Sequence, residues 1–254
     1  MKQIPNLFTL LNLVFGCIAI VFIMQSGLSV QYSSEGSQLA YVPEKIVFGS
    51  LFIGLAAVVD FLDGFIARLF KATSEMGKQL DSLADVVSFG TAPSLILFQL
   101  LRRSFAGEAG GIDVSMLWLA PAFVFAAAAA YRLAKFNISD VQQNVFLGVP
   151  TPAAGLLIAS FPLIYWYSAN DFVLSLLTNA WVLYAVIIIV SMLMVSNIKL
   201  MSLKLKSFGL KENLPIWLLL AIGLVAALFC QWLSVLIIFL AYIILSLLFI
   251  KKSS

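Results

Sequence analysis

Four aspartates within one short stretch are the residues of this sequence best suited to chemistry. Asp60 and Asp63 are three residues apart, and Asp81 and Asp85 are four apart. Both spacings place the two carboxylates of a pair on one face of a helix. The sequence contains no histidine, so acid–base or metal chemistry has to use carboxylates and other oxygen ligands. Oxygen ligands favour a hard cation such as Mg²⁺ or Mn²⁺.

The residues between the two aspartate pairs are suited to a phosphate ligand. Gly64 has no side chain, so a large group can approach the helix backbone there, and Gly77 leaves similar room one turn before Asp81. Arg68 carries a guanidinium, whose fork of donors matches a phosphate. Four close carboxylates repel each other unless one or two divalent cations balance them. Together these features indicate a site for a diphosphate.

The elements that must position these residues are membrane helices. The chain has 254 residues, of which 62% are hydrophobic and 11% charged, and its mean hydropathy is +1.06. A soluble domain carries about a quarter charged residues. Apolar runs of about 17–25 residues, long enough to cross a bilayer, recur along the chain. We expect an all-α polytopic membrane protein with about eight transmembrane helices, near residues 7–24, 46–66, 82–101, 115–134, 151–168, 177–197, 213–230 and 232–250.

This division places the aspartates at one face of the membrane. The first pair ends the second helix and the second pair begins the third, so the four carboxylates can converge. Twelve of the fifteen basic residues fall on the same side as the N-terminus, which predicts that this side is cytoplasmic and that both termini lie there. These twelve are Lys2, Arg68, Lys71, Lys78, Arg132, Lys135, Lys199, Lys204, Lys206, Lys211, Lys251 and Lys252.

The segments between the helices supply further expectations. Residues 25–45 form the longest outer loop, and the basic stretch 199–213 is expected at the cytoplasmic interface, near anionic lipid headgroups. "FCQWLS" leaves only a very tight outer turn between the last two helices. Pro150 and Pro152 are expected to open the fifth helix, because proline suits a first helical turn.

Two other interpretations of the acids remain open from the residues alone. They can be interfacial side chains that are solvated by water and paired with Lys71 or Lys78. They can also line the path of a divalent-cation transporter, since carboxylates inside a membrane often mark ion pathways. The sequence has no matching acids on the outer half of the helices, which disfavours a path.

The acidic stretch resembles the signature of the CDP-alcohol phosphatidyltransferase family. The matching residues are Asp60, Asp63, Gly64, Ala67, Arg68, Gly77, Asp81 and Asp85. The resemblance covers residues 1–200 and implies a six-helix catalytic core. It leaves residues 201–254 as a basic connector and a C-terminal helix pair, to which no chemistry is assigned.

Looser segments narrow the resemblance to one branch of that family. They are "IPNLFTLLNLVFG", "SFGTAPSLIL", "YRLAKFN" and "FLGVPTPAAG". They are similar to the branch that transfers a phosphatidyl group from CDP-diacylglycerol to L-serine and releases CMP. Glycerol 3-phosphate and inositol phosphate remain alternative acceptors, because their synthases carry the same acidic signature. The resemblance also implies a homodimer in membrane lipid, with no nucleic-acid partner.

The resemblance implies roles for the acids. Asp60 and Asp81 would bridge two divalent metal ions, Mg²⁺ or Mn²⁺. Asp63 would complete the first metal site and Asp85 the second. Asp85 would also be the general base, and thus the catalytic residue.

The resemblance also implies contacts with the nucleotide-linked lipid. Gly64, Arg68 and Ser74 would touch CDP-diacylglycerol, with room left by Gly77. Asn6 and Thr9 would line the nucleotide pocket, and helix capping after Pro5 is their alternative role. These expected donor-site residues are Asn6, Thr9, Gly64, Arg68, Ser74 and Gly77.

An amino-acid acceptor needs a cation for its carboxylate and an oxygen for its ammonium group. Arg132 and Lys135 lie at the end of the fourth predicted helix, on the same side as the acids, and are candidates for the cation. Asn137 and Ser88 are expected nearby. Arg132 and Lys135 can instead be anchors that fix the orientation of the helix in the membrane.

Overall fold

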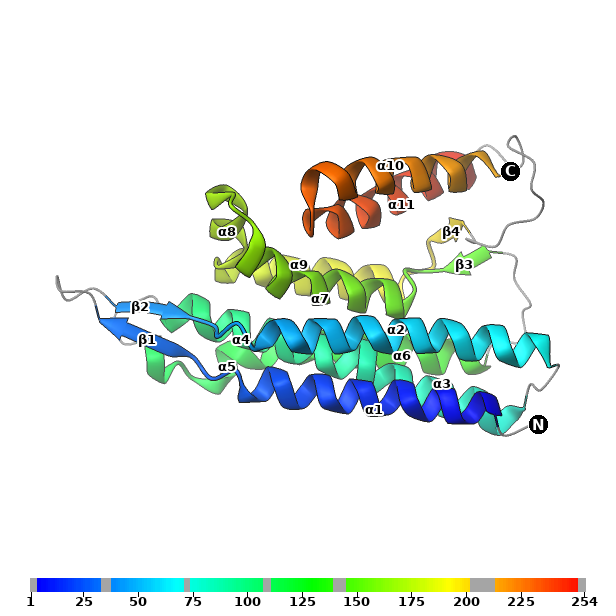
Figure 1. Ribbon diagram of the computed structural model, residues 1–254, viewed down its shortest axis with the longest axis horizontal. Helices are drawn as coiled ribbons and strands as arrows, with labels where there is room; N and C mark the ends of the chain where they lie inside the picture. The colour runs from blue at the N-terminus through cyan, green and yellow to red at the C-terminus, as the bar shows by residue number, and fades with distance from the viewer. Residues whose placement is uncertain are drawn as a thin grey trace.

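The computed structural model is a bundle of helices with two small two-stranded antiparallel sheets (Figure 1). This confirms the expected all-α polytopic membrane class. The structure describes residues 4–32, 38–70, 74–106, 111–138, 145–201 and 213–250. Lys2, Lys71, Lys204, Lys206, Lys211, Lys251 and Lys252, which entered the orientation argument, lie outside these ranges.

Two long apolar helices begin the chain and pack against each other. Helix α1 spans Ile4–Gln25 and α2 spans Ile46–Leu69. The stretch between them, expected to be a loop, contains the antiparallel strands β1 (Ser29–Tyr32) and β2 (Gln38–Tyr41). Apolar and polar residues alternate through β1, a pattern that favours a strand over a helix.

The third span is one continuous helical rod that carries the second aspartate pair. It consists of α3 (Glu75–Asp85), a π-helical turn η1 (Val86–Thr91) and α4 (Ala92–Ala106). The rod is longer at both ends than the expected 82–101. It starts earlier because Ser74 caps it before the apolar run begins. A π-helical turn shifts the register of side chains and is frequent at functional sites. Here it follows Asp85 directly.

The next span begins irregularly and then becomes a regular helix. After the short turn η2 (Gly111–Asp113) come α5 (Met116–Leu119), the 3₁₀ turn η3 (Ala120–Phe123) and α6 (Val124–Ile138). Pro121 lies in the 3₁₀ turn, where its missing N–H interrupts the α-helical bonds.

A second two-stranded sheet brings together the segment before α7 and the segment after α9. Strand β3 (Val145–Leu147) pairs antiparallel with β4 (Lys199–Met201). Helix α7 (Thr151–Tyr167) follows β3, and Pro150 is its N-terminal cap. The expectation that the "GVPTP" prolines open this helix is confirmed.

The sixth expected span is bent rather than straight. In place of one helix over 177–197, the structure has α8 (Asp171–Leu177) and α9 (Ala180–Val195), inclined to each other by 71°. The side chain of Asn179 accepts hydrogen bonds from the first N–H groups of α9 and so starts a new helix.

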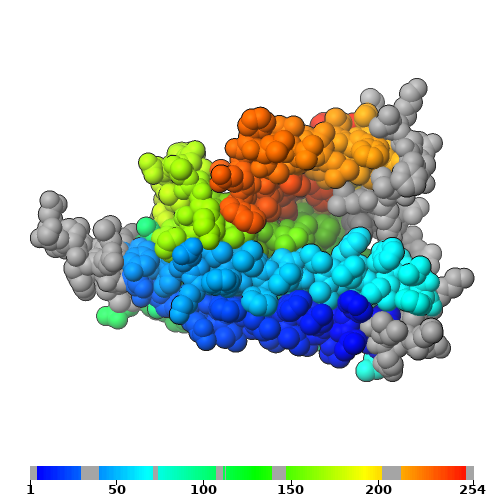
Figure 2. Space-filling view, in the orientation of Figure 1, coloured from blue at the N-terminus to red at the C-terminus, as the bar shows by residue number. Residues whose placement is uncertain are grey.

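The last two helices form a tight antiparallel pair. Helix α10 spans Leu214–Cys230 and α11 spans Leu233–Ile250. Gln231 in the turn between them has a positive φ of 47°, in keeping with the very tight turn that the sequence predicts. Helix α11 packs on α7 and β4, and Figure 2 shows α10 and α11 (orange to red) as a ridge on the far side of α7 from α1.

Four of the described helices are long and apolar enough to cross a membrane. They are Pro5–Gln25, Ile46–Leu69, Glu75–Ala106 and Met116–Ile138, and the bent pair α8–α9 makes a fifth if it counts as one span. The total of eight spans stays a prediction. Figure 1 places the start of α1, the end of α2 and the β3–β4 pair at one end of the bundle.

Candidate active site

The acids that end α2 and begin α3 meet in space. Asp60, Asp63 and Asp81 each offer one carboxylate oxygen, and these three oxygens lie within 4.8 Å of one another. The carboxyl group of Asp60 also contacts those of Asp81 and Asp85. The expected convergence of the two pairs is therefore what the structure contains.

The chemistry and spacing of the three oxygens fit a divalent cation. Mg²⁺ binds oxygen at about 2.0–2.1 Å, so two ligands on opposite sides of it are about 4.2 Å apart. The three carboxylate oxygens, all within 4.8 Å of one another, approach that spacing. Among the described residues, no hydrogen bond from a lysine or arginine reaches these acids, so a cation is the natural counter-charge.

Asp85 lies beside this group of three rather than inside it. Its side chain is only 6% exposed, and its Oδ1 accepts a hydrogen bond of 3.3 Å from the Asn12 side chain on α1. The other side-chain atom of Asn12, Oδ1, is buried and has no hydrogen-bond partner among the described residues. Asn12 holds one orientation of the Asp85 carboxylate and presents an acceptor next to it.

Helix α1 supplies a second contact to the acids. The hydroxyl of Thr9 lies 2.7 Å from Oδ2 of Asp63 and 3.2 Å from the carbonyl of Pro5. Thr9 is buried within the helix, so capping does not explain it. Asn6 lies one turn earlier, and its Oδ1 would be 3.0 Å from a Cβ placed on Gly77. Both N-terminal candidates therefore adjoin the acidic region.

The loop side of the site is shaped by a helix cap. Ser74 is exposed, and its side chain accepts a hydrogen bond of 3.0 Å from the N–H of Gly77. Ser74 is thus the N-cap of α3, which satisfies one of the N–H groups at the start of that helix. Its proposed contact with substrate is compatible with this role because the cap lies at the surface.

The face of α2 beside the acids is open. A Cβ added to Gly64 would meet nothing within 4 Å, so Gly64 borders free space rather than a packed neighbour. Arg68, one turn further on, is exposed at the end of α2. Ala67 between them is half-buried. A ligand can reach the backbone here without displacing a side chain.

The acceptor candidate Arg132 is buried close to the acids. Only 9% of it is exposed, and its charge interacts with that of Asp85. One guanidinium nitrogen lies 3.2 Å from the hydroxyl of Thr151 at the start of α7, while Nε has no hydrogen-bond partner among the described residues. A buried arginine with an unused donor is poorly explained as a surface anchor.

The other acceptor candidates have different positions. The ammonium group of Lys135 lies 2.7 Å from Oδ1 of Asn197, just after the end of α9. Asn137 donates to Ser82 at 2.7 Å, and its carbonyl accepts from Lys78 at 3.0 Å, so it joins α6 to α3. These residues line the same end of the bundle as Arg132 but are more exposed.

Ser88 belongs to a helix contact. It is fully buried and donates to the carbonyl of Asn12 at 3.1 Å. A Cβ on Gly16 would come within 2.3 Å of its hydroxyl, so α1 and η1 touch through a glycine. A Cβ on Gly155 would likewise lie 2.9 Å from Phe89. Small residues thus let three helices approach closely around the π-helical turn.

Sequence reasoning did not single out three residues of this region. Asn12, Thr151 and Ser82 contact Asp85, Arg132 and Asn137, respectively. Asn12 carried a usable signal, because it is a polar residue inside the apolar run of α1, on the same face as Thr9. Thr151 and Ser82 carried none, since threonine and serine are common near helix starts.

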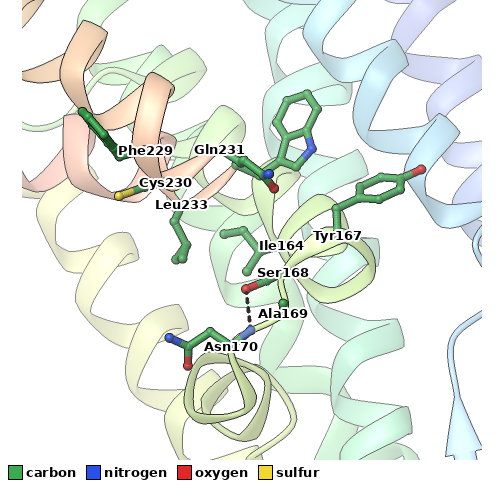
Figure 3. A pocket seen from close by; sticks show the side chains of 10 residues that line it. Ile164, Tyr167, Ser168, Ala169, Asn170, Phe229, Cys230, Gln231 and Leu233 are labelled. Carbon is green, nitrogen blue, oxygen red and sulfur yellow. Dashed lines mark hydrogen bonds between the residues drawn. The ribbon is translucent and has the colours of Figure 1, made fainter.

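A separate cavity lies at the opposite end of the bundle. It has a volume of about 580 Å³ and lies between the end of α7 and the α10–α11 turn (Figure 3). Its lining includes Tyr167, Asn170, Gln231 and Trp232. Helix α7 is 17 residues long, so this end is about 25 Å from Thr151. The cavity therefore belongs to another part of the molecule than the acids.

Comparison with known proteins agrees with the geometry. Residues 2–192 match the family model described as CDP-alcohol phosphatidyltransferase. Three similar proteins are each named CDP-diacylglycerol–serine O-phosphatidyltransferase. The chain is 32% identical to the one from Helicobacter pylori over 213 residues, which is 82% of this chain and 75% of that protein.

The other two relatives match shorter stretches. The Bacillus subtilis protein is 32% identical over 163 residues, 63% of this chain and 77% of its own length. The Methanocaldococcus jannaschii protein is 32% identical over 157 residues, 61% of this chain. The chain spans 65% of the archaeal protein, slightly less than two thirds of it.

Proposed function

Because the chain belongs to the CDP-alcohol phosphatidyltransferase family, we propose that it makes phosphatidylserine from CDP-diacylglycerol and L-serine and releases CMP. One observation carries the proposal. The carboxylate oxygens of Asp60, Asp63 and Asp81 gather within 4.8 Å at one end of a membrane bundle, where a lipid-linked diphosphate is within reach. The names of the relatives point to serine as the acceptor.

The acids are proposed to hold two divalent ions, Mg²⁺ or Mn²⁺. Asp60 and Asp81 would be shared between them, with Asp63 and Asp85 completing one site each. Bound there, the ions would neutralise the diphosphate and polarise the phosphorus under attack. Thr9 supports this arrangement, because its hydrogen bond fixes the orientation of the Asp63 carboxylate.

Asp85 is proposed as the general base. The hydroxyl of serine is a weak nucleophile and needs a group that takes its proton, and the chain contains no histidine. Asp85 is buried, adjoins Asp60 and is oriented by Asn12. Because Asp85 is also a proposed metal ligand, the oxygen that takes the proton would be the one not bound to the ion.

The donor is proposed to lie along the open face of α2. Gly64 would let the diphosphate approach the backbone, and the exposed Arg68 would pair with a phosphate oxygen. Asn6 and Ser74, on either side of Gly77, would border the nucleotide. The free space beside Gly64 supports this placement.

The acceptor is proposed to bind between the acids and α7. The guanidinium of Arg132 would pair with the carboxylate of serine, since it is buried near Asp85 and has an unused donor. Lys135 would contribute positive charge further out. Glycerol 3-phosphate and inositol phosphate are the alternative acceptors, and both carry a phosphate that Arg132 can also bind.

A divalent-cation transporter is the second kind of function that intramembrane acids suggest. Within the described part of the chain, only Asp60, Asp63 and Asp81 form a group of three or more acids with close ligand atoms. Glu44 and Asp171 lie toward the opposite end and belong to no such group. The described residues therefore offer an ion no second acidic site along a path across the membrane. The enzyme is the better supported proposal.

We also propose the cellular setting. Residues 1–200 would be the catalytic core and 201–254 a connector with a helix pair, supported by the family match over residues 2–192. The basic residues predict a cell-membrane protein with both termini and the active site on the cytoplasmic side. A homodimer is proposed from the family resemblance alone.

The direct test offers the acceptors separately. Purified protein is incubated with CDP-diacylglycerol and Mg²⁺ or Mn²⁺, and CMP release is measured with serine, glycerol 3-phosphate or inositol phosphate. We expect release with serine alone. Release with glycerol 3-phosphate but not with serine would show that glycerol 3-phosphate, not serine, is the acceptor. Release with none of the three would refute the proposed enzymatic activity.

A further inference from the structure

The C-terminal helix α11 lies outside the residues that match the family, yet it reaches the acceptor side of the bundle. The match ends at residue 192, and α11 begins at Leu233. Helix α11 packs on α7 and β4. Two of its polar side chains, Tyr242 and Ser246, are almost fully buried, with 5% and 0% exposed. Burying a polar group is costly unless it forms a hydrogen bond.

Tyr242 and Ser246 hold a single residue of strand β4. The hydroxyl of Tyr242 donates to the carbonyl of Met201 at 3.1 Å, and the N–H of Met201 donates to the hydroxyl of Ser246 at 3.3 Å. Tyr242 and Ser246 are four positions apart in the sequence, so their side chains lie on one face of α11. The helix thus binds both backbone groups of Met201.

Strand β4 connects these hydrogen bonds to the start of α7, because β4 pairs with β3 and β3 precedes α7. Met201 pairs with Val145 in β3, and β3 leads into Gly148. Gly148 has a φ of +68°, and its N–H donates to the carbonyl of Ile198 at 2.9 Å. A Cβ at this position would lie 2.4 Å from the carbonyl of Met194, so only glycine fits. The turn before α7 is therefore fixed on several sides.

The first residue of α7 contacts the acceptor candidate. Thr151 lies 3.2 Å from a guanidinium nitrogen of Arg132. Tyr242 itself is near enough to Arg132 for the two groups to interact electrostatically. Helix α11 is therefore linked to Arg132 in two ways, through the β3–β4 sheet and Thr151 and through the side chain of Tyr242.

We infer that α11 is part of the acceptor site, with Tyr242 and Ser246 as positioning residues that fix Arg132 for the carboxylate of an amino-acid acceptor. The inference rests on the proposed function. It gives the C-terminal helix pair a role that the catalytic signature on α2 and α3 does not contain. The donor site and the acids are not in contact with Tyr242 or Ser246 through any described hydrogen bond.

The test separates the two substrates. Tyr242→Phe and Ser246→Ala each remove one hydrogen bond and keep most of the packing. A hydrogen bond of this kind contributes about 0.5–1.5 kcal/mol, so we expect the KM for serine to rise about threefold to tenfold in each variant. The KM for CDP-diacylglycerol and the melting temperature should stay close to those of the wild type.

A serine on the same helix provides the matched control. Ser234 is also buried, at the other end of α11 beside the tight turn. Ser234→Ala should leave the KM for serine unchanged. If α11 only stabilises the bundle, all three variants will lower the melting temperature without changing the ratio of the two KM values, and the inference is overturned.

The wild-type protein tests the proposed function in the same experiment. A wild type that releases no CMP with serine overturns both the function and the inference. A wild type with a measurable KM for serine, together with unchanged values in Tyr242→Phe and Ser246→Ala, overturns the role of α11 alone. A selective increase in the KM for serine supports both.

Discussion

The hydroxyl of Thr9 lies 2.7 Å from Oδ2 of Asp63. This contact joins α1 to α2 across 54 positions of sequence, and Asn12 makes the equivalent contact with Asp85 on α3. Helix α1 therefore orients one acid from each pair. Groups that orient metal-ligating carboxylates commonly matter almost as much as the ligands themselves.

Removing the Thr9 hydroxyl should weaken the metal site without unfolding the bundle. Thr9→Val keeps the shape of the side chain and leaves Asp63 without its fixed donor. We expect the concentration of Mn²⁺ needed for half-maximal activity to rise about tenfold. Thr91→Val is the control, because among the described residues the Thr91 hydroxyl bonds only to Val86 in its own helix. An equal effect in both variants would argue against a role for Thr9 in the site.

Replacing the proposed base should separate binding from turnover. Asp85→Asn preserves the size of the side chain and removes its ability to take a proton. We expect CMP release to fall by about 10²–10⁴-fold, the usual contribution of general acid–base catalysis, while CDP binding measured by calorimetry persists. Asp171→Asn, at the start of α8, should keep full activity. Substantial turnover in Asp85→Asn would refute the assignment of the base.

Two glycines of α2 offer a matched pair for the donor site. A Cβ on either Gly64 or Gly54 meets nothing within 4 Å, so alanine should be tolerated structurally at both positions. Alanine favours a helix over glycine by about 1 kcal/mol, and neither variant should melt below the wild type. Only Gly64→Ala should raise the KM for CDP-diacylglycerol, because only Gly64 adjoins the acids. Equal KM values in the two variants would contradict the proposal that CDP-diacylglycerol binds along this face of α2.

The orientation in the membrane can be tested with single cysteines. The native thiols, Cys17 and Cys230, are unpaired and are first changed to serine. Glu75→Cys lies at the start of α3, at the same end of the bundle as the acids, and Ala169→Cys lies just before α8, at the other end. A maleimide that cannot cross membranes should label only Ala169→Cys in intact cells. Labelling of Glu75→Cys alone would show that the end of the bundle with the acids faces the outside of the cell, opposite to the proposed orientation.

The parts of the molecule that could be predicted from sequence are those with local signals. Long apolar runs gave the membrane class, and the helical spacing of Asp60 with Asp63 and of Asp81 with Asp85 indicated that their carboxylates share faces. Convergence of the two pairs followed because a short connection makes neighbouring helices antiparallel. The structure brings three of these four acids into one group.

Other parts depended on contacts between distant segments. The bend between α8 and α9 results from the Asn179 cap, which a hydropathy window averages out. The hydrogen bond from Arg132 to Thr151 joins residues 19 positions apart on different helices. The hydrogen bond from Tyr242 to Met201 joins residues 41 positions apart. Neither contact has a spacing rule, so neither could be predicted without the fold.

The most direct measurement is the metal dependence of CDP binding. Calorimetric titration of CDP into the detergent-solubilised protein is compared in Mn²⁺ and after chelation with EDTA, for the wild type and for Asp60→Asn and Asp81→Asn. If the acids of α2 and α3 grip a diphosphate through divalent cations, the wild type binds CDP only with Mn²⁺ and both variants lose most of that binding. CDP binding that is equally strong in EDTA and in Mn²⁺, or unchanged in the two variants, would contradict the claim that these acids bind the diphosphate through divalent cations.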